Sequence, residues 1–127
     1  MIPTYVLDTG ALVCAERGKE RVARFFRLAQ MGRAVLIVPF PVVAEWWRGQ
    51  RGHIARLLDA LHIEPLSASL ARLVGETMAR VPRATLVDTV VIASAASRGD
   101  LVLTADIEDL TRIRDAAFPS VRVRRVV

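Results

Sequence analysis

The chain has one cysteine, one lysine, two histidines and no long hydrophobic run among its 127 residues. The single Cys14 excludes a disulfide within the chain and a zinc site built from several thiolates. We expect it to be a small buried residue on an early helix. No apolar run reaches the roughly 18 residues of a membrane span, and the first residues lack the basic region of a secretory signal. We therefore expect a soluble, cytoplasmic protein with no membrane partner.

Several common catalytic patterns are also absent. The sequence contains no GxxxxGK[ST] loop and no GxGxxG turn, which excludes the usual nucleotide-binding cradles. It contains no GxSxG elbow, which excludes the common serine-hydrolase arrangement. A phospho-acceptor receiver domain would require a lysine at the end of a late strand, whereas the only lysine is Lys19.

The composition is apolar and basic. Hydrophobic residues make up 53% of the chain and the mean hydropathy is +0.35, which excludes a disordered chain and fits a sheet covered on both faces. The length suits a single domain, residues 1–127. The net charge is +5, and seventeen arginines supply nearly all of the positive charge. This excess either attracts a polyanion such as nucleic acid or reflects genome composition, and composition alone leaves both interpretations open.

Short apolar segments alternate with helical patterns along the chain, which predicts a mainly parallel sheet of about four to five strands flanked by α-helices. The residue Gly99 is a typical helix stop. Val121–Val126 alternates with arginines, and we interpret it as an edge strand protected by charge. The expected strands are Thr4–Leu7, Ala34–Val38, Leu101–Thr104 and Val121–Val126, and the expected helices are Arg21–Met31, His53–His62, Ser67–Arg80 and Thr85–Arg98.

Four acidic residues occupy positions where a charged side chain would be energetically unfavourable in the folded protein. Asp8 and Asp106 follow the strands Thr4–Leu7 and Leu101–Thr104, where ligands bind in parallel sheets. Glu45 has apolar neighbours, which favours an interior position. Asp88 interrupts an apolar helix with no basic residue nearby, so we expect it to be buried. Carboxylates that converge repel one another unless a cation or a proton lies between them.

Purely structural roles compete with this interpretation. Asp8 could cap the helix that follows it by accepting a backbone N–H, and we weigh capping and metal binding equally there. Asp106 also lies at an expected helix start. The Asp109 side chain could accept a hydrogen bond from the backbone N–H of Asp106, as in a capping box. For Glu108 and Asp109 we favour the cap or a solvated helix face.

The chemistry of the acids favours a hard cation. Oxygen ligands without a histidine partner select Mg²⁺, with Mn²⁺ as a substitute, over zinc. His53 and His62 lie on a predicted amphipathic helix and are interpreted as surface residues or as residues whose hydrogen bonds are satisfied within the protein. An all-carboxylate site suits hydrolysis of phosphate esters, where one or two metal ions act on water and on the leaving oxygen.

The acids fall within four segments of the chain, which are Tyr5–Leu12, Val42–Glu45, Asp88–Ala93 and Leu103–Leu110. In the order and spacing of these segments the chain resembles PIN-domain ribonucleases, and most closely the VapC-type toxins of bacterial toxin–antitoxin pairs. Members often have Asp-Pro-Asp-Asp after the strand of the last segment, whereas this chain has Asp-Ile-Glu-Asp at residues 106–109. Thr89 also stands where alanine is common.

The resemblance implies a single PIN-like domain, a catalytic metal site and a reaction. The reaction would be Mg²⁺-dependent hydrolysis of an RNA phosphodiester that leaves a 5′-phosphate and a 3′-hydroxyl. The implied site consists of Asp8, Glu45, Asp88 and Asp106, with Asp109 as an additional ligand and with Thr9 and Thr104 as supporting hydroxyls.

The resemblance also implies a homodimer and a cognate VapB-like antitoxin that blocks the acidic site. The pair Trp46-Trp47 is compatible with a groove for an antitoxin helix, although we expect at least one of the two to be core. The alternative function is a catalytically inactive PIN-like module that binds RNA or protein, in which the acids are helix caps. DNA is a lesser alternative as the substrate.

Overall fold

The computed structural model describes all residues from Met1 to Val127 and contains one five-stranded sheet. All neighbouring strands are parallel, and their order is β3-β2-β1-β4-β5. The prediction of a mainly parallel α/β domain with about four to five strands is confirmed. The strands are β1 (Thr4–Leu7), β2 (Val35–Pro39), β3 (Leu61–Glu64), β4 (Leu101–Thr104) and β5 (Arg122–Arg125).

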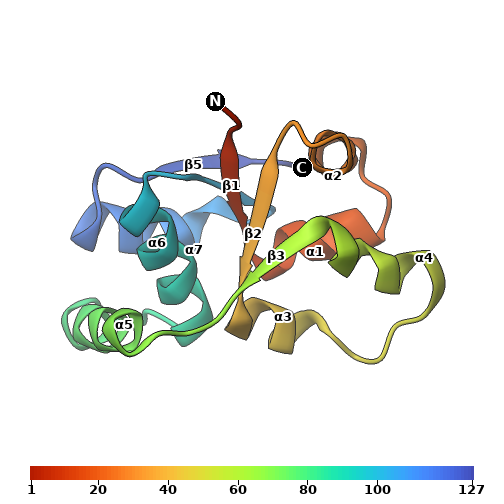
Figure 1. Cartoon of the computed structure of the whole chain (residues 1–127). Helices are drawn as coiled ribbons and strands as arrows, with labels where there is room; N and C mark the ends of the chain where they lie inside the picture. Colours follow the sequence, from red (N-terminus) through yellow and green to blue (C-terminus); the bar gives the residue numbers. More distant parts are fainter.

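Helices cover both faces of this sheet. Figure 1 shows α5, α6 and α7 gathered on one side of β1 and β2, with α1, α2 and α4 on the other. This arrangement follows from right-handed crossovers between parallel strands. The helices are α1 (Thr9–Glu16), α2 (Glu20–Gln30), α3 (Phe40–Trp46), α4 (Gly52–Ala55), the 3-10 helix η1 (Arg56–Ala60), α5 (Ala68–Arg80), α6 (Leu86–Arg98) and α7 (Ile107–Ala117).

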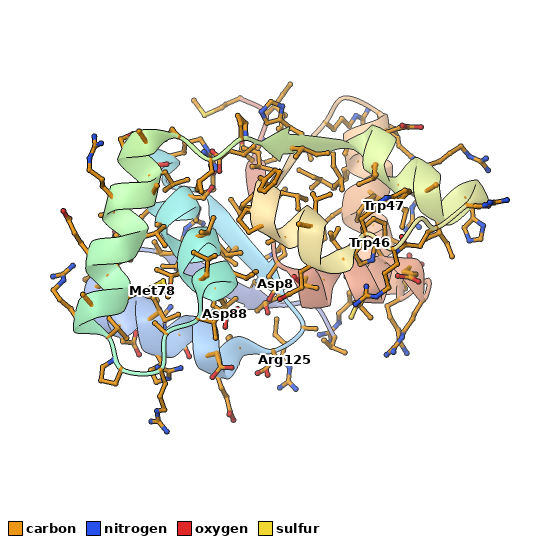
Figure 2. The ribbon with its side chains drawn as sticks, turned by 90° about the horizontal axis from the view of Figure 1, so that it is seen from below. Asp8, Trp46, Trp47, Met78, Asp88 and Arg125 are labelled. Carbon is orange, nitrogen blue, oxygen red and sulfur yellow. The ribbon has the colours of Figure 1, made fainter.

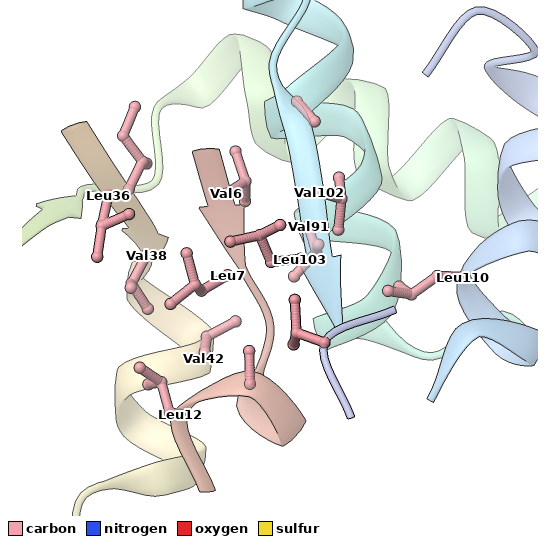
Figure 3. Close-up of a cluster of buried hydrophobic side chains, with 14 of the residues drawn as sticks. Val6, Leu7, Leu12, Leu36, Val38, Val42, Val91, Val102, Leu103 and Leu110 are labelled. Atoms are coloured by element: carbon pink, nitrogen blue, oxygen red, sulfur yellow. The ribbon is translucent and has the colours of Figure 1, made fainter. Parts of the chain in front are cut away.

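The core lies between the sheet and these two helical layers. Its main cluster contains 24 buried hydrophobic residues, and β4 is buried along its whole length. Figure 3 shows side chains of the central strands meeting those of the helices on both faces, among them Leu12 of α1, Val91 of α6 and Leu110 of α7. Strands covered on both faces need continuous apolar sequences. This explains why β1 and β4 consist of consecutive apolar residues rather than alternating apolar and polar ones.

The ends of α5 and α6 agree with their sequence signals. The Ser67 hydroxyl accepts a hydrogen bond from the N–H of Leu70 at 3.1 Å, and the Thr85 hydroxyl accepts one from Asp88 at 3.3 Å. Gly99 ends α6 with φ of 76°, a left-handed conformation that favours glycine. The predictions for Ser67–Arg80 and Thr85–Arg98 are confirmed.

The helix predicted over His53–His62 is wrong in its second half. The helical segment ends at Ala60, and Leu61–Glu64 form β3, which pairs with β2. The spacing of Ile54, Leu57 and Leu61 suits a helix, but pairing with the edge of β2 overrides that local pattern. Both histidines are exposed, as predicted.

Other expectations are confirmed by the packing. Cys14 is buried on α1. β5 is an edge strand, and its three arginines are exposed, although it is shorter than the predicted Val121–Val126. None of the helices has the length and apolar character that a membrane crossing requires.

Candidate metal centre

Five carboxylates line one hollow of about 190 Å³ at the carboxyl edge of the sheet. We call this hollow the acidic pocket. No hydrophobic residue lines it. Residues about a hundred positions apart in the sequence meet there, and the five acids of the metal site implied by the family resemblance are among them. The lining residues are Asp8, Thr9, Gly10, Glu45, Asp88, Asp106 and Asp109.

The topology explains why these residues meet. Asp8 and Asp106 follow β1 and β4, which are adjacent parallel strands and therefore end at the same edge. α6 and α7 begin at that edge, which places Asp88 and Asp109 in the first turns of their helices. Figure 2, seen from below, shows the side chains of Asp8 and Asp88 near the middle of the molecule. The first turn of a helix also stabilises negative charge.

Asp8 caps α1 and also lines the acidic pocket. One oxygen, Oδ1, caps α1 by accepting a hydrogen bond from the N–H of Ala11 at 2.8 Å. The other, Oδ2, accepts a hydrogen bond from the buried Thr104 hydroxyl. The residue is only 7% exposed, and burial raises the pKa of Asp8 to about 6. The two hydrogen bonds oppose this rise in pKa, and the charges of Asp88 and Asp106 add to it.

Asp88 is half-buried rather than buried, which corrects the sequence prediction. It lies in the first turn of α6, where the side chain reaches the acidic pocket instead of the core. Burial still raises the pKa of Asp88, and the Thr85 side chain opposes the rise. Asp109, Glu45 and Asp106 raise this pKa further by charge repulsion.

Glu45 is exposed, so the prediction of an interior position is wrong. It lies in the last turn of α3, whose buried face is formed by Val42 and Trp46 instead. A helix with apolar residues on either side of an acid can still turn that acid outward, because consecutive side chains point in different directions. Glu45 nevertheless lines the acidic pocket.

Asp106 and Asp109 are exposed at the start of α7. Asp106 caps this helix by accepting a hydrogen bond from the N–H of Glu108 at 3.2 Å. The expected capping box does not form, because the N–H of Asp106 donates to the Thr104 hydroxyl at 3.0 Å. Asp109 instead pairs with Arg112, one turn along α7, at 3.5 Å.

Thr9 and Gly10 complete the lining. Thr9 Oγ1 is a buried oxygen with no hydrogen-bond partner, and it is the only such side-chain atom in the protein. A Cβ atom at Gly10 would lie 3.1 Å from the Cβ of Ala105, so glycine allows the start of α1 to approach the loop after β4. Sequence reasoning did not single out Gly10, and the only available signal was a glycine directly after the Asp8-Thr9 pair.

The donor chemistry of the acidic pocket suits a hard divalent cation, although the side chains are not arranged around one point. No three Asp, Glu, His or Cys side chains anywhere in the structure stand as the ligands of one metal ion. The pocket offers only oxygen atoms, including the unpartnered Thr9 hydroxyl. Its two most buried acids have no arginine or lysine partner. Such oxygen-only sets favour Mg²⁺ or Mn²⁺.

The largest hollow on the molecule lies elsewhere. It measures about 480 Å³ and is lined mainly by residues of β3, α5 and the loop between them, with Glu64 as its only acid.

Trp46 is fully buried, and its indole N–H donates to Glu16 at 2.9 Å, while Trp47 is 40% exposed. The expectation that at least one tryptophan belongs to the core is confirmed.

No family model matches the sequence, and no curated protein does either. Solved structures do match over nearly the whole chain. VapBC2 from Rickettsia felis bound to promoter DNA is 18% identical, covers 96% of this chain and 98% of its own, and has a TM-score of 0.71. DNA-bound VapBC from Salmonella typhimurium is 19% identical over all of both chains, with a TM-score of 0.71. The chain has the PIN-domain fold.

A third match extends this comparison to a toxin with a stated target. VapC20 from Mycobacterium tuberculosis, a toxin that cleaves the sarcin–ricin loop, is 19% identical, covers 93% of this chain and 98% of its own, and has a TM-score of 0.63. The PIN-domain fold anticipated by the resemblance of the four acidic segments is therefore confirmed at the level of the backbone.

Proposed function

We propose that this protein is a Mg²⁺-dependent endoribonuclease of the VapC type, acting in the cytoplasm. The observation that carries the proposal is the acidic pocket, in which five carboxylates from separate parts of the chain surround one polar hollow. Its two most buried members have raised pKa values and no basic partner. Similarity of fold to a toxin that cleaves an RNA loop supports RNA as the substrate class.

Some residues of the pocket would bind the metal ion, and others position these metal ligands through hydrogen bonds. Asp8, Glu45, Asp88 and Asp106 would hold Mg²⁺, with Mn²⁺ as a substitute and Asp109 as an additional ligand. When bound, the cation would acidify a water molecule and neutralise charge on the phosphate. The N–H of Ala11 and the hydroxyl of Thr104 fix both oxygens of Asp8. The unpartnered Thr9 hydroxyl can donate to a further oxygen in the pocket.

The reaction transfers the phosphoryl group from a ribose oxygen to water. Glu45, an exposed carboxylate of the pocket, would either bind the cation directly or orient the attacking water and accept its proton. The bond between phosphorus and the 3′ oxygen breaks, and that oxygen leaves as a 3′-hydroxyl after protonation. The products are a 5′-phosphate and a 3′-hydroxyl end.

We further propose a cognate VapB-like antitoxin and a homodimer as the partners. The neighbours VapBC2 and VapBC are toxin–antitoxin complexes, which supports an antitoxin here. Phe40 is the first residue of α3 and Trp47 directly follows its last residue, and the two are 57% and 40% exposed. These two aromatic side chains are suited to contact an antitoxin segment that covers the acidic pocket.

The test is an assay of purified, antitoxin-free protein on total cellular RNA with MgCl₂, followed by mapping of new 5′-phosphate ends. Parallel reactions contain EDTA or the Asp8→Asn variant. We expect discrete cuts that disappear in both controls. Cuts that persist in Asp8→Asn would overturn the assignment of the site. The absence of cuts in the wild-type reaction would favour the alternative of a non-catalytic RNA- or protein-binding module.

A further inference from the structure

A second polar hollow adjoins the acidic pocket and contains two arginines. It measures about 400 Å³ and is lined by Arg83, Glu108, Asp109 and Arg112. Asp109 lines both hollows, so the two are neighbours on the surface. Positive charge therefore lies directly beside the carboxylates, between the start of α6 and the first turns of α7.

Arg83 has an unusual backbone. It is the only residue other than glycine with a positive φ, which is 62°, in the short loop between α5 and α6. This left-handed conformation is unfavourable for a residue with a Cβ atom. Such conformations persist only where surrounding contacts hold them, and they are concentrated at functional sites.

Arg112 of α7 supplies the contacts that hold this loop. Its guanidinium donates to the carbonyl of Pro82 at 2.6 Å and to the carbonyl of Arg83 at 3.3 Å. The same guanidinium pairs with Asp109 at 3.5 Å. Arg112 thus ties the loop before α6 to the helix that carries Asp109, and its donors are largely used within the protein.

The side chain of Arg83, in contrast, is free. The residue is exposed, and its guanidinium takes part in none of the ion pairs and none of the side-chain hydrogen bonds of the structure. An arginine held in a costly backbone conformation, without a protein partner, beside a carboxylate pocket is a site for an external anion. A guanidinium binds phosphate oxygens in a fork geometry that few other side chains offer.

We propose that Arg83 binds a phosphate of the RNA strand next to the one that is cleaved, and that Arg112 positions Arg83 for this contact. The inference rests on the proposed ribonuclease function and assigns one substrate-binding residue to it. The acidic pocket repels a polyanion, so the strand needs a cation beside the pocket to be held across it. Arg83 supplies that cation on the α5–α6 side.

The test compares three variants at this position with a matched control. Arg83→Ala removes the charge, Arg83→Lys keeps a charge without the fork, and Arg83→Gly removes the charge while relieving the positive φ. Arg72 is an exposed arginine of α5 that has no ion pair and lines none of the hollows described here, so Arg72→Ala is the control. The first readout is binding of a short fluorescent single-stranded RNA in EDTA at several salt concentrations.

We expect Arg83→Ala and Arg83→Gly to weaken RNA binding about fivefold and to reduce the salt dependence by about 0.7 in the log–log slope, the value for one phosphate contact on a single strand. Arg83→Lys should recover part of the affinity, and Arg72→Ala should match the wild type. The Gly variant should keep or raise the melting temperature, which separates lost binding from lost stability. In the cleavage reaction KM should rise while kcat stays within about twofold.

Equal effects of Arg72→Ala and Arg83→Ala would overturn the inference, because they would indicate general charge rather than a site. Unchanged affinity and salt slope in both the Ala and Gly variants, or a wild-type protein that does not bind the RNA, would overturn it as well. The binding readout requires no cleavage. A protein that binds RNA through Arg83 but never cuts would therefore contradict the proposed ribonuclease and leave the Arg83 contact supported.

Discussion

Helix α6 carries an acidic cluster at each of its ends, and the two clusters differ in their partners. At its start, Asp88 shares the acidic pocket with four other carboxylates, of which only Asp109 has a basic partner. Near its end, Arg98 pairs with both Glu64 and Asp100, the latter at 2.7 Å. Ser94, one turn before Arg98, donates to Glu64 and accepts from Arg98 at 2.8 Å.

The difference separates carboxylates that are paired with an arginine from buried and half-buried carboxylates that have no basic partner. In the cluster around Arg98, each of the two carboxylates has a basic partner within the protein. In the acidic pocket, burial and mutual repulsion raise the pKa of Asp8 and of Asp88. Buried charge without a partner is retained against its cost only where it serves another purpose, and a cation would remove that cost.

The largest expected effect is on catalysis. Asp88→Asn should reduce RNA cleavage by more than about 100-fold, the upper end of the loss seen when only a supporting partner of a metal ligand is removed. The fold should remain intact, because the Asp88 side chain lies at the pocket and not in the core. Glu76→Gln, at an exposed acid of α5, is the matched control and should cleave normally. Equal cleavage by Asp88→Asn and the control would contradict the proposed site.

The next largest effect is a change with pH in the unfolding free energy of the metal-free protein. The pKa of Asp8 is about 6 when folded, against an ordinary value of 3.8, so the folded state holds this proton more tightly than the unfolded state. Stability from this group is therefore present below about pH 4 and is lost as pH rises through 6, by about 3 kcal/mol. Asp8→Asn should remove this loss.

This prediction is measured by urea denaturation in EDTA across pH 4 to 7 for the wild type and Asp8→Asn. The difference in unfolding free energy between the two proteins isolates Asp8 from the other titrating groups. It should shift in favour of Asp8→Asn as pH rises. A difference that is flat with pH would show that the carboxyl of Asp8 titrates normally.

Disrupting the cluster around Arg98 should lower the stability of the fold and should not change RNA cleavage. Arg98→Ala leaves Glu64 and Asp100 without their cation, and because these groups are partly buried we expect a loss of about 2 kcal/mol, between the values for exposed and buried pairs. Cleavage per folded molecule should equal that of the wild type, as measured below the melting temperature of the variant. A loss of activity without a loss of stability would show that the two clusters are not separate.

The smallest effect is stabilisation by Mg²⁺. At about ten times its dissociation constant, a cation that binds only the folded state adds about 1.4 kcal/mol. The melting temperature should therefore rise with MgCl₂ in the wild type and in Arg98→Ala, and should not respond in Asp8→Asn. An identical response in all three proteins would indicate a general salt effect rather than a bound ion.

Much of the fold was predictable because its signals are local. The stop at Gly99 and the apolar runs of β1 and β4 each depend on neighbouring residues only. Strand β3 was missed because a short segment with helical spacing becomes a strand only when β2 is beside it. The same limit applied to Glu45, whose exposure depends on which face of α3 packs against the core.

For this protein, the sequence by itself determined most of the strands and helices, the parallel α/β class and the identity of the acids that line the pocket. It did so because apolar periodicity and the ends of strands depend on residues that are close together in the sequence. Only the tertiary structure decided that Asp8 is both a cap and a pocket residue, that Asp88 is half-buried, and that Arg112 holds the loop of Arg83. Burial and charge pairing depend on contacts between distant segments, which no local pattern specifies.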